Sequence, residues 1–361
     1  MQSKNPLPFS FTGSGGEYFR IWIVNVFLTI ITLGIYSAWA KVRRNQYFYR
    51  NTWLDEANFD YHGNPVAILK GRILAVALLV AYNFSGKISP LLFLAVAILI
   101  GIVMPYLLLK SFRFRAINTS YRGLRFGFSA PLKDAYKTFL LLPVLTVFTL
   151  YLLAPFTHQR IKKFQHDHSR FGITPFHFDA PVGKFYKIYG VVLLLYIVLI
   201  GALAAMLVPL FMASNNVDAS KVAFVTTIVL VFFVLVALVI GPYFIARLQN
   251  LVWNHTTLGD QPRDLQAINP AYYEQTKGIH TFESAVKARA LLWIFLTNFI
   301  GIIFTLGLFK PFADIRLARY RLSHVQLIAD GNLEDFISHQ QGNVDASGEE
   351  VAEIFDLDIA L

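Results

Sequence analysis

The sequence predicts an all-α polytopic membrane protein, built from five internal repeats and about seven hydrophobic segments, some of them re-entrant. Composition is the first reason. Apolar residues make up 55% of the 361 residues, charged residues only 15%, and the mean hydropathy is +0.51, whereas soluble domains average about 25% charged residues. The second reason is a pattern of about 15 residues that recurs five times, because self-similarity of this kind dictates architecture.

The apolar stretches have the length of membrane helices. A span needs roughly 20 residues, and several runs reach or approach that length: 19–40, 91–109, 138–156, 188–212, 222–246 and 290–309, with a shorter run at 73–84. We therefore expect a multi-pass protein with the lipid bilayer as its main partner.

The recurring pattern follows these runs and begins at Ala38, Pro105, Pro155, Pro242 and Pro311. Its second residue is aromatic: Trp39, Tyr106, Phe156, Tyr243 and Phe312. Its sixth is basic: Arg43, Lys110, Arg160, Arg247 and Arg316. Its fourteenth is polar: Asn51, Asn118, His168, His255 and His324. Steps of four residues place these side chains on one face of a helix.

Alternating aromatics such as Phe9 and Phe11 precede the apolar runs and predict a short strand at the membrane surface. Each repeat then consists of a surface strand, an apolar segment and a basic-aromatic helix. The predicted repeats span about 8–58, 59–125, 126–175, 176–278 and 279–329 within a membrane domain of residues 1–329. Residues 330–361 hold many of the acidic residues and predict a disordered cytoplasmic tail.

Charge distribution discriminates between two topologies. If all seven runs cross the bilayer, basic residues fall almost evenly on both sides. If the first, third and fifth units are re-entrant, only Lys87 and Lys221 lie outside, and 30 of the 32 basic residues are cytoplasmic. The positive-inside rule favours the second topology.

The blocks PFSFTGSGGEYFRIW and LGIYSAWAKVRRNQYFYRNTWLDEANFDYHG, together with the elements FGFSAP and FHFDAP, carry a family resemblance. The chain resembles the YjgN family of bacterial inner-membrane proteins over nearly all of its length. The resemblance implies a multi-pass protein of the bacterial cytoplasmic membrane. It assigns no activity to any residue.

The sixth-position basic residues, each near the second-position aromatic, are the first candidate site. They are suited to contact an anionic lipid phosphate while the rings lie at headgroup depth. The same pattern also arises without a specific ligand. The charged groups of Lys and Arg then extend to the membrane–water interface, and the aromatic rings form a belt there.

The fourteenth-position residues favour helix capping or hydrogen bonding between repeats, because Asn and His share a donor and an acceptor. A zinc site formed by the three histidines is the weaker alternative, since no carboxylate recurs near them. Asn25 and Asn298 are intramembrane polar residues related by a shift of 273 positions. We expect both to be buried against protein and to bond backbone groups freed where their segments turn.

Three functions remain open. A non-enzymatic transporter or channel for a solute or amphiphile is favoured by repeats with interrupted helices. An anionic-lipid-binding or envelope-organising protein is the alternative. An intramembrane enzyme is least favoured, because no catalytic motif is present and the chain has no cysteine. We expect no nucleic-acid partner, because the net charge of +10 follows from Lys and Arg that flank apolar runs. We also expect no cofactor and no metal. A protein partner for the acidic tail has no support in the sequence.

Overall fold

The computed structural model describes residues 4–212, 218–259, 279–330, 333–334 and 336–337. Its strands are β1 Lys4–Phe11, β2 Thr52–Leu54, β3 Ala57–Tyr61, β4 Thr119–Tyr121, β5 Leu124–Phe128, β6 Ser169–Phe171, β7 Thr174–Phe178, β8 Thr256–Leu258, β9 His280–Ser284 and β10 Val325–Asp330. Its helices are α1 Gly15–Ile31, α2 Ser37–Arg50, α3 Pro65–Ile88, α4 Pro90–Ile117, α5 Leu132–Tyr136, η1 Lys137–Leu141, α6 Leu142–Phe148, α7 Ala154–Asp167, α8 Val182–Met212, α9 Ala219–Trp253, α12 Ala288–Phe304 and α13 Lys310–Leu322.

The strands form one closed antiparallel barrel in the order β1-β10-β9-β8-β7-β6-β5-β4-β3-β2. Tight turns join β2 to β3, β4 to β5 and β6 to β7. Positive φ angles at Asp55 (44°), Glu56 (62°) and Arg122 (47°) are those of the turns that match the twist of a hairpin. Helical hairpins join β1 to β2, β3 to β4, β5 to β6, β7 to β8 and β9 to β10. Because connections alternate between the two ends of an antiparallel barrel, all helical hairpins leave from the same end.

The barrel interior is packed with aromatic rings. Phe9, Phe59, Phe126, Phe176 and Phe282 form a continuous series whose successive ring centroids lie 6.2, 6.4, 6.3 and 6.3 Å apart. The Trp253 ring closes the series, at 5.0 Å from Phe282 and 6.3 Å from Phe9. Stacked rings of this kind add to the free energy of burial. These rings belong to one hydrophobic cluster with the buried Leu54, Tyr121, Phe171 and Leu258 of β2, β4, β6 and β8.

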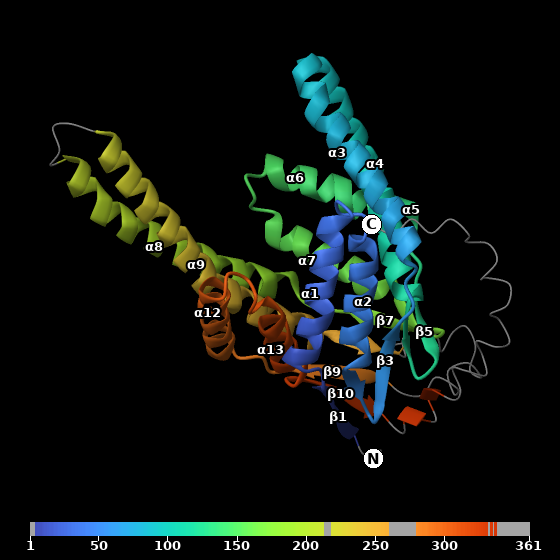
Figure 1. Ribbon diagram of the computed structural model, residues 1–361. Helices are drawn as coiled ribbons and strands as arrows, with labels where there is room; N and C mark the ends of the chain where they lie inside the picture. Colours follow the sequence, from blue (N-terminus) through green and yellow to red (C-terminus); the bar gives the residue numbers. More distant parts are fainter. Residues whose placement is uncertain (1–3, 213–217, 260–278, 331–332, 335, 338–361) are drawn as a thin grey trace.

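Two long hairpins extend from the barrel as diverging arms, α3–α4 and α8–α9 (Figure 1). Four helices have the length and hydropathy of membrane spans: Pro65–Ile88, Pro90–Ile117, Val182–Val208 and Ser220–Trp253. Asn64 and Ser89 cap the first two through side-chain bonds to backbone N–H groups. The other three hairpins are shorter: α1–α2, α5–η1–α6–α7 and α12–α13 (Figure 1).

The predicted all-α fold class is wrong. A single closed barrel of ten strands, rather than five serial units, organises the chain, and four helices rather than about seven segments have spanning length among the described residues. The strands are only three to eight residues long, and β1 pairs with β10 across the whole chain, with Lys4 opposite Asp330. Local periodicity cannot detect such distant pairing. The fivefold pattern is a feature of the sequence, and it did not predict the closed sheet.

The predicted acidic tail, 330–361, lies mostly outside the described residues. Within it, Leu333 and Ile337 are buried against the barrel core. The boundary predicted after residue 329 falls at the end of β10.

Candidate functional site

The helices that return to the barrel (α2, α4, α7, α9 and α13) end with a side-chain hydrogen bond. At each fourteenth position the side chain contacts the backbone carbonyl four residues earlier, at 2.8 Å for Asn51, Asn118, His255 and His324 and 3.0 Å for His168. Because a carbonyl only accepts, the histidine Nδ1 atoms carry the hydrogen, as the Asn Nδ2 atoms do. This is the capping bond expected from the shared chemistry of Asn and His. Among the described residues no three His, Asp or Glu side chains gather as a metal site.

The sixth-position basic residues do not all behave alike. Three lie over their second-position ring: Lys110 at 5.8 Å from the centroid of Tyr106, Arg160 at 4.9 Å from Phe156, and Arg247 at 5.6 Å from Tyr243. Such cation–π contacts keep a charge at the surface while its stem covers apolar groups.

The first and fifth copies depart from this arrangement. Arg43 lies 5.8 Å from the ring of Tyr36, and Trp39 instead stacks on Tyr36 at 6.2 Å. The second-position ring of Phe312 stacks on Phe309 at 5.6 Å. Arg316 turns into its own hairpin, where it makes hydrogen bonds. Lipid contact by the sixth-position residues stays a prediction.

Sequence reasoning missed the ninth position of the pattern. There Arg113, Lys163 and Arg319 donate to the carbonyl oxygens of Ala130, Phe178 and Gly13, at 3.2, 3.0 and 2.8 Å. Each carbonyl belongs to the end of a strand or to the turn after it. These cations are therefore structural and fix the helices on the barrel rim. The signal was available, because three of the five copies are basic at this position.

A second set of cations lies between α2, α4 and α7. Lys41, Arg115 and Lys162 interact electrostatically, with Arg115 close enough to act on both lysines. Arg72 of α3 also acts on Lys41 and donates to the Ser37 hydroxyl. No carboxylate forms an ion pair with these four side chains within the part of the chain that the structure describes. We call these four residues the inner cation cluster. Lys41, Arg115 and Lys162 hold the fourth, eleventh and eighth positions of the repeated pattern and Arg72 lies outside it, so the sequence did not single them out.

The electrostatic consequence is a positive local potential. Burial, followed by the charges of Arg72 and Arg115, lowers the pKa of Lys41. Burial and Arg115 lower the pKa of Lys162. Burial, with Lys162 as a further cause, lowers the pKa of His166 to about 4. Each shift disfavours the cationic form, so an anion placed here relieves unfavourable charge.

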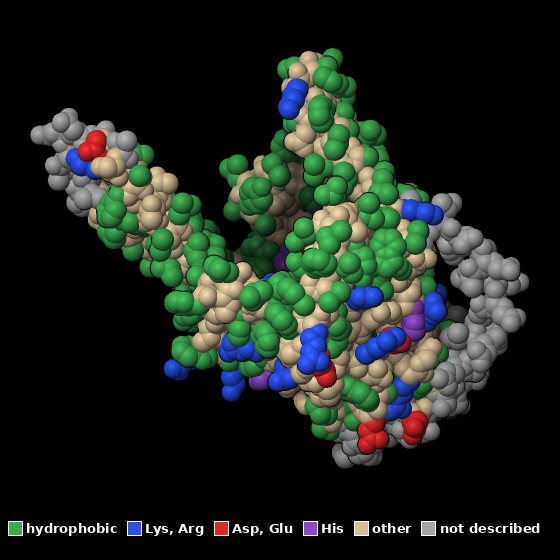
Figure 2. Space-filling model, in the orientation of Figure 1, with side chains coloured by type: hydrophobic (Ala, Val, Ile, Leu, Met, Phe, Trp, Pro, Cys, Tyr) green, Lys and Arg blue, Asp and Glu red, His purple; other side chains and the backbone are tan. Residues whose placement is uncertain are grey.

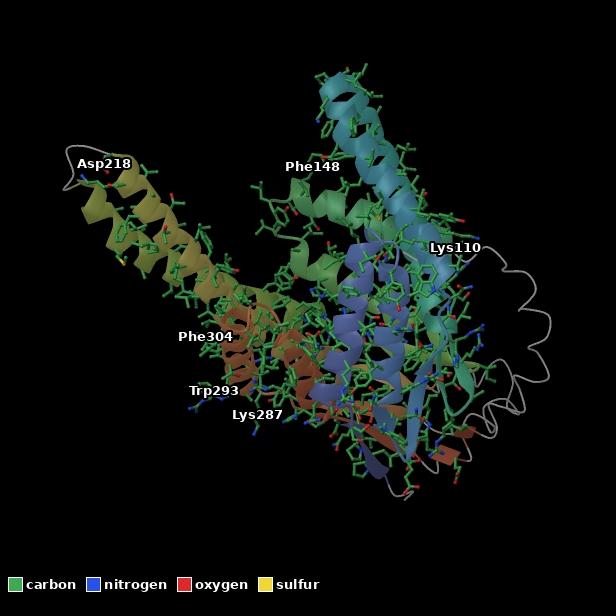
Figure 3. All side chains as sticks on the ribbon, viewed as in Figure 1. Lys110, Phe148, Asp218, Lys287, Trp293 and Phe304 are labelled. Atoms are coloured by element: carbon green, nitrogen blue, oxygen red, sulfur yellow. The ribbon has the colours of Figure 1, made fainter. Side chains whose placement is uncertain are left out.

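The short hairpins end in exposed apolar tips. Leu33, Leu150 and Leu306 are 94%, 85% and 95% exposed, and Phe148 and Phe304 lie near the ends of their hairpins in Figure 3. Figure 2 shows apolar side chains over the arms and tips, while Lys and Arg gather on the body below. Exposed apolar area of this extent marks a membrane contact.

The two intramembrane asparagines are buried, at 7% and 8% exposure for Asn25 and Asn298. Asn298 donates to the Ala313 carbonyl at 3.3 Å and accepts from Arg316 at 2.8 Å. Asn25 Oδ1 has no hydrogen-bond partner. The backbone groups freed at the turns are instead bonded by threonines, as described below.

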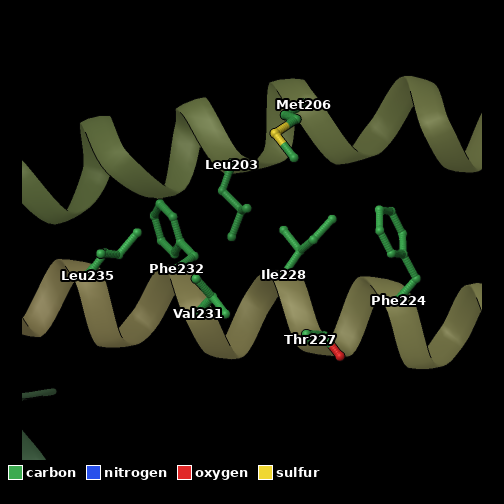
Figure 4. Close-up of a pocket in the computed structure, with 8 residues that line it drawn as sticks. All are labelled: Leu203, Met206, Phe224, Thr227, Ile228, Val231, Phe232 and Leu235. Carbon is green, nitrogen blue, oxygen red and sulfur yellow. The ribbon is translucent and has the colours of Figure 1, made fainter. Parts of the chain in front are cut away.

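An apolar groove lies within the α8–α9 arm (Figure 4). It has a volume of about 320 Å³, and its lining is Leu203, Met206, Phe224, Thr227, Ile228, Val231, Phe232 and Leu235. A groove between membrane-spanning helices with one hydroxyl in its lining suits an acyl chain and offers no group for catalysis.

Comparison with known proteins decides the family. The family described as "Bacterial protein of unknown function (DUF898)" matches residues 6–354. The chain belongs to this family.

Relatives give the cellular location. The inner membrane protein YjgN of Salmonella typhimurium (strain LT2) is 34% identical over 144 residues, which are 40% of this chain and 36% of the relative. YjgN of Escherichia coli (strain K12) is 32% identical over 143 residues, 38% of this chain and 35% of the relative. The alignments thus span about a third of each relative. No solved structure matches the chain.

The resemblance to YjgN is confirmed. With four helices of spanning length, this DUF898 member is a protein of the bacterial inner membrane, as expected. The family is described as one of unknown function and assigns no chemistry to any residue of this chain.

Proposed function

We propose that this protein binds anionic amphiphiles, phospholipids in the first place, where its helical hairpins leave the barrel. The inner cation cluster carries the proposal. Burial and the charge of Arg115 disfavour the charged forms of Lys41 and Lys162, and no carboxylate forms an ion pair with these residues among those that the structure describes. A group of like charges without a counter-ion is costly in a folded protein. An anionic headgroup supplies the missing charge.

The geometry of the barrel supports a membrane placement for this proposal. Since all helical hairpins leave one end, the barrel lies on a single side of the bilayer, and the arms cross it and return. Lys87 lies near the far tip of α3–α4, and Lys221 near that of α8–α9, where Asp218 is labelled in Figure 3. The other basic residues then lie on the barrel side, which the positive-inside rule assigns to the cytoplasm. The protein is multi-pass in this arrangement, and the three short hairpins are re-entrant.

Acyl chains find contact surface beside the cluster. The short hairpins expose Leu33, Leu150 and Leu306, and the α8–α9 groove accepts a further chain. Burial of each methylene contributes about 0.8 kcal/mol. In this arrangement the cation cluster binds the headgroup of a phospholipid, and the hairpins contact its acyl chains.

A transporter or channel for a solute or amphiphile is the function that the sequence favoured, and a route along the barrel axis has no support in the described residues. The stacked phenylalanines fill the interior, so a route there requires unpacking of the core. We therefore propose binding rather than transport. The absence of enzymatic activity remains a prediction.

The test is the retention of lipid by the full chain. The purified protein is delipidated in neutral detergent and titrated with phosphatidylglycerol, and bound lipid is counted by native mass spectrometry. Replacement of Lys41, Arg115 and Lys162 by Gln should weaken binding about a hundredfold, since each basic residue near an anionic lipid contributes about 1 kcal/mol.

The matched control removes three charges elsewhere. Lys133, Lys137 and Lys187 are exposed and lie outside the cluster, so their replacement by Gln changes net charge equally. The control should retain most of its lipid. Equal losses in the two triple variants would contradict the proposal and leave only non-specific attraction. Because the cluster is self-repulsive, its replacement should not lower the thermal stability of the lipid-free protein.

A further inference from the structure

The α1–α2 and α12–α13 hairpins have the same backbone. The N–H of Gly34 donates to Thr29 at 2.8 Å, and that of Gly307 to Ile302 at 2.8 Å. The φ angles are 49° and 52° at Leu33 and Leu306, and 92° and 94° at the glycines. Both first helices have 17 residues. Residues 273 positions apart therefore occupy equivalent places in the two hairpins.

In α12–α13 the polar groups at these places satisfy one another. Arg316 donates to Asn298 Oδ1 at 2.8 Å and to the Thr297 hydroxyl at 3.0 Å. Asn298 Nδ2 donates to the Ala313 carbonyl at 3.3 Å. The aromatic residue at the start of the second helix is Phe309, which has no polar atom. The polar side chains of this hairpin thus find their hydrogen-bond partners within the hairpin itself.

In α1–α2 the equivalent groups are left open. Val24 replaces Thr297, so an acceptor for the guanidinium is missing, and Tyr36 replaces Phe309, so a hydroxyl is added. Arg43 lies 5.8 Å from the Tyr36 ring centroid. Among the described residues, neither the buried Asn25 Oδ1 nor the buried Tyr36 hydroxyl has a hydrogen-bond partner.

The unpaired groups of α1–α2 differ in whether they require a hydrogen-bond donor or an acceptor. An unpaired buried polar atom costs about 1–3 kcal/mol, so a ligand that supplies the missing bonds binds with that free energy in its favour. Arg43 and the Tyr36 hydroxyl donate hydrogen bonds to an anion such as phosphate. Asn25 Oδ1 accepts only, and therefore requires a hydroxyl or ammonium donor.

We propose that the α1–α2 hairpin is a headgroup site for a phosphodiester that also carries a hydrogen-bond donor. Arg43 and Tyr36 hold the phosphate, and Asn25 accepts from the hydroxyl of a glycerol head or the ammonium of an ethanolamine head. The inference rests on the proposed binding of amphiphiles and adds a second site with defined selectivity. Phe27, Ile30 and Ile31, which are 61–68% exposed on α1, provide the surface for the acyl chains.

The test compares two lipids of equal charge. Phosphatidylglycerol has donor hydroxyls in its head, whereas phosphatidylmethanol has none. With both lipids titrated against the delipidated full chain in detergent, the wild type should prefer phosphatidylglycerol about fivefold, as one hydrogen bond allows. Asn25→Leu should abolish this preference without loss of thermal stability, because it removes an unpaired polar group.

Charge removal is the second measurement. Arg43→Gln and Tyr36→Phe should each weaken binding of both lipids at this site. Arg289→Gln is the matched control, because Arg289 is exposed on α12, in the equivalent hairpin, and lies in neither proposed lipid site. A soluble competitor, glycerophosphoglycerol, separates the possible sources of the phosphodiester. Competition at equal concentration would assign the site to a free headgroup, and weak competition to a membrane lipid.

An unchanged lipid preference in Asn25→Leu, or equal losses in Arg43→Gln and Arg289→Gln, would overturn the inference. Such a result leaves the proposed function intact, because the inner cation cluster is tested by other residues. Conversely, if the cluster variants bind normally but Asn25→Leu loses selectivity, the hairpin site stands and the cluster does not.

Discussion

The α1–α2 and α12–α13 hairpins share a backbone and differ in the use of their polar side chains. In one, Arg316, Asn298 and Thr297 form a closed set of hydrogen bonds. In the other, Asn25 and Tyr36 keep unpaired oxygens. The difference shows that the hairpin backbone does not require these polar pairs, because both backbones form whether or not the groups are paired. The polar side chains were therefore free to acquire separate roles, stability in α12–α13 and binding in α1–α2.

The largest effect that distinguishes the hairpins is expected at their sixth-position arginines. Arg316→Gln should lower the free energy of unfolding by about 1.5–3 kcal/mol, because a charged donor is lost and Asn298 is left buried with an unpaired oxygen. Arg43→Gln should cost less than about 0.5 kcal/mol, since this guanidinium makes no hydrogen bond. Thermal unfolding of lipid-free protein in one detergent measures both. Equal losses would mean that the two hairpins use their arginines alike.

The next effect concerns the turns that the hairpins share. The Thr32 hydroxyl donates to the Leu28 carbonyl at 2.7 Å and accepts from the Tyr36 N–H at 2.9 Å. The Thr305 hydroxyl makes the same two bonds, at 2.6 and 2.9 Å. In lipid these bonds have no water to replace them.

Val at Thr32 or Thr305 should therefore destabilise the protein by about 0.6–1.7 kcal/mol each. Thr149→Val should cost less, because its bond from the Leu153 N–H is longer, at 3.4 Å. Amide hydrogen exchange at Tyr36, Phe309 and Leu153 gives a local measurement. If exchange is unchanged in Thr32→Val and Thr305→Val, the hydroxyls do not hold the turns.

The smallest effect is electrostatic. Lys41 of α2 and Asp314 of α13 occupy equivalent positions in the two hairpins. Asp314 forms an ion pair with Lys310. Burial and neighbouring cations hold the pKa of Lys41 below its usual value, so the unfolded chain binds this proton more tightly than the folded one. The charged lysine therefore destabilises the fold at neutral pH, and stability returns as pH rises through the folded pKa toward the unfolded value near 10.4.

Lys41→Met should accordingly raise the melting temperature of lipid-free protein at pH 7, and flatten its increase at alkaline pH. Added phosphatidylglycerol should stabilise the wild type more than this variant. Asp314→Asn, the equivalent change in α13, should have the opposite sign at pH 7, because it removes a carboxylate with a cationic partner. If Lys41→Met is less stable than wild type without lipid, the cluster is not self-repulsive.

Sequence reasoning located the helix ends well. The Asn and His residues at the fourteenth position were expected to cap, and each bonds the carbonyl four residues back. This could be predicted because capping is local: donor and acceptor lie within one turn of the same helix. The expected equivalence of Asn25 and Asn298 held for burial but not for hydrogen bonding, which depends on residues of the facing helix.

The barrel and the inner cation cluster could not be read from the sequence. The strand β2 has three residues and pairs with β1 some forty positions earlier. Neither the length nor the periodicity of such a strand predicts a sheet. Lys41, Arg115 and Lys162 lie on different helices at unrelated positions of the pattern. Only the closure of the barrel brings α2, α4 and α7 together.

The sequence by itself determined the membrane location, the apolar segments and the local ends of the helices, because each depends on composition or on groups within a few residues. The tertiary structure alone decided that all hairpins leave one end of a closed sheet, that the sheet is filled by phenylalanine rings, and that cations from separate helices face one another. These features depend on contacts between residues far apart in the chain, whose pairing follows from the closure of the whole barrel.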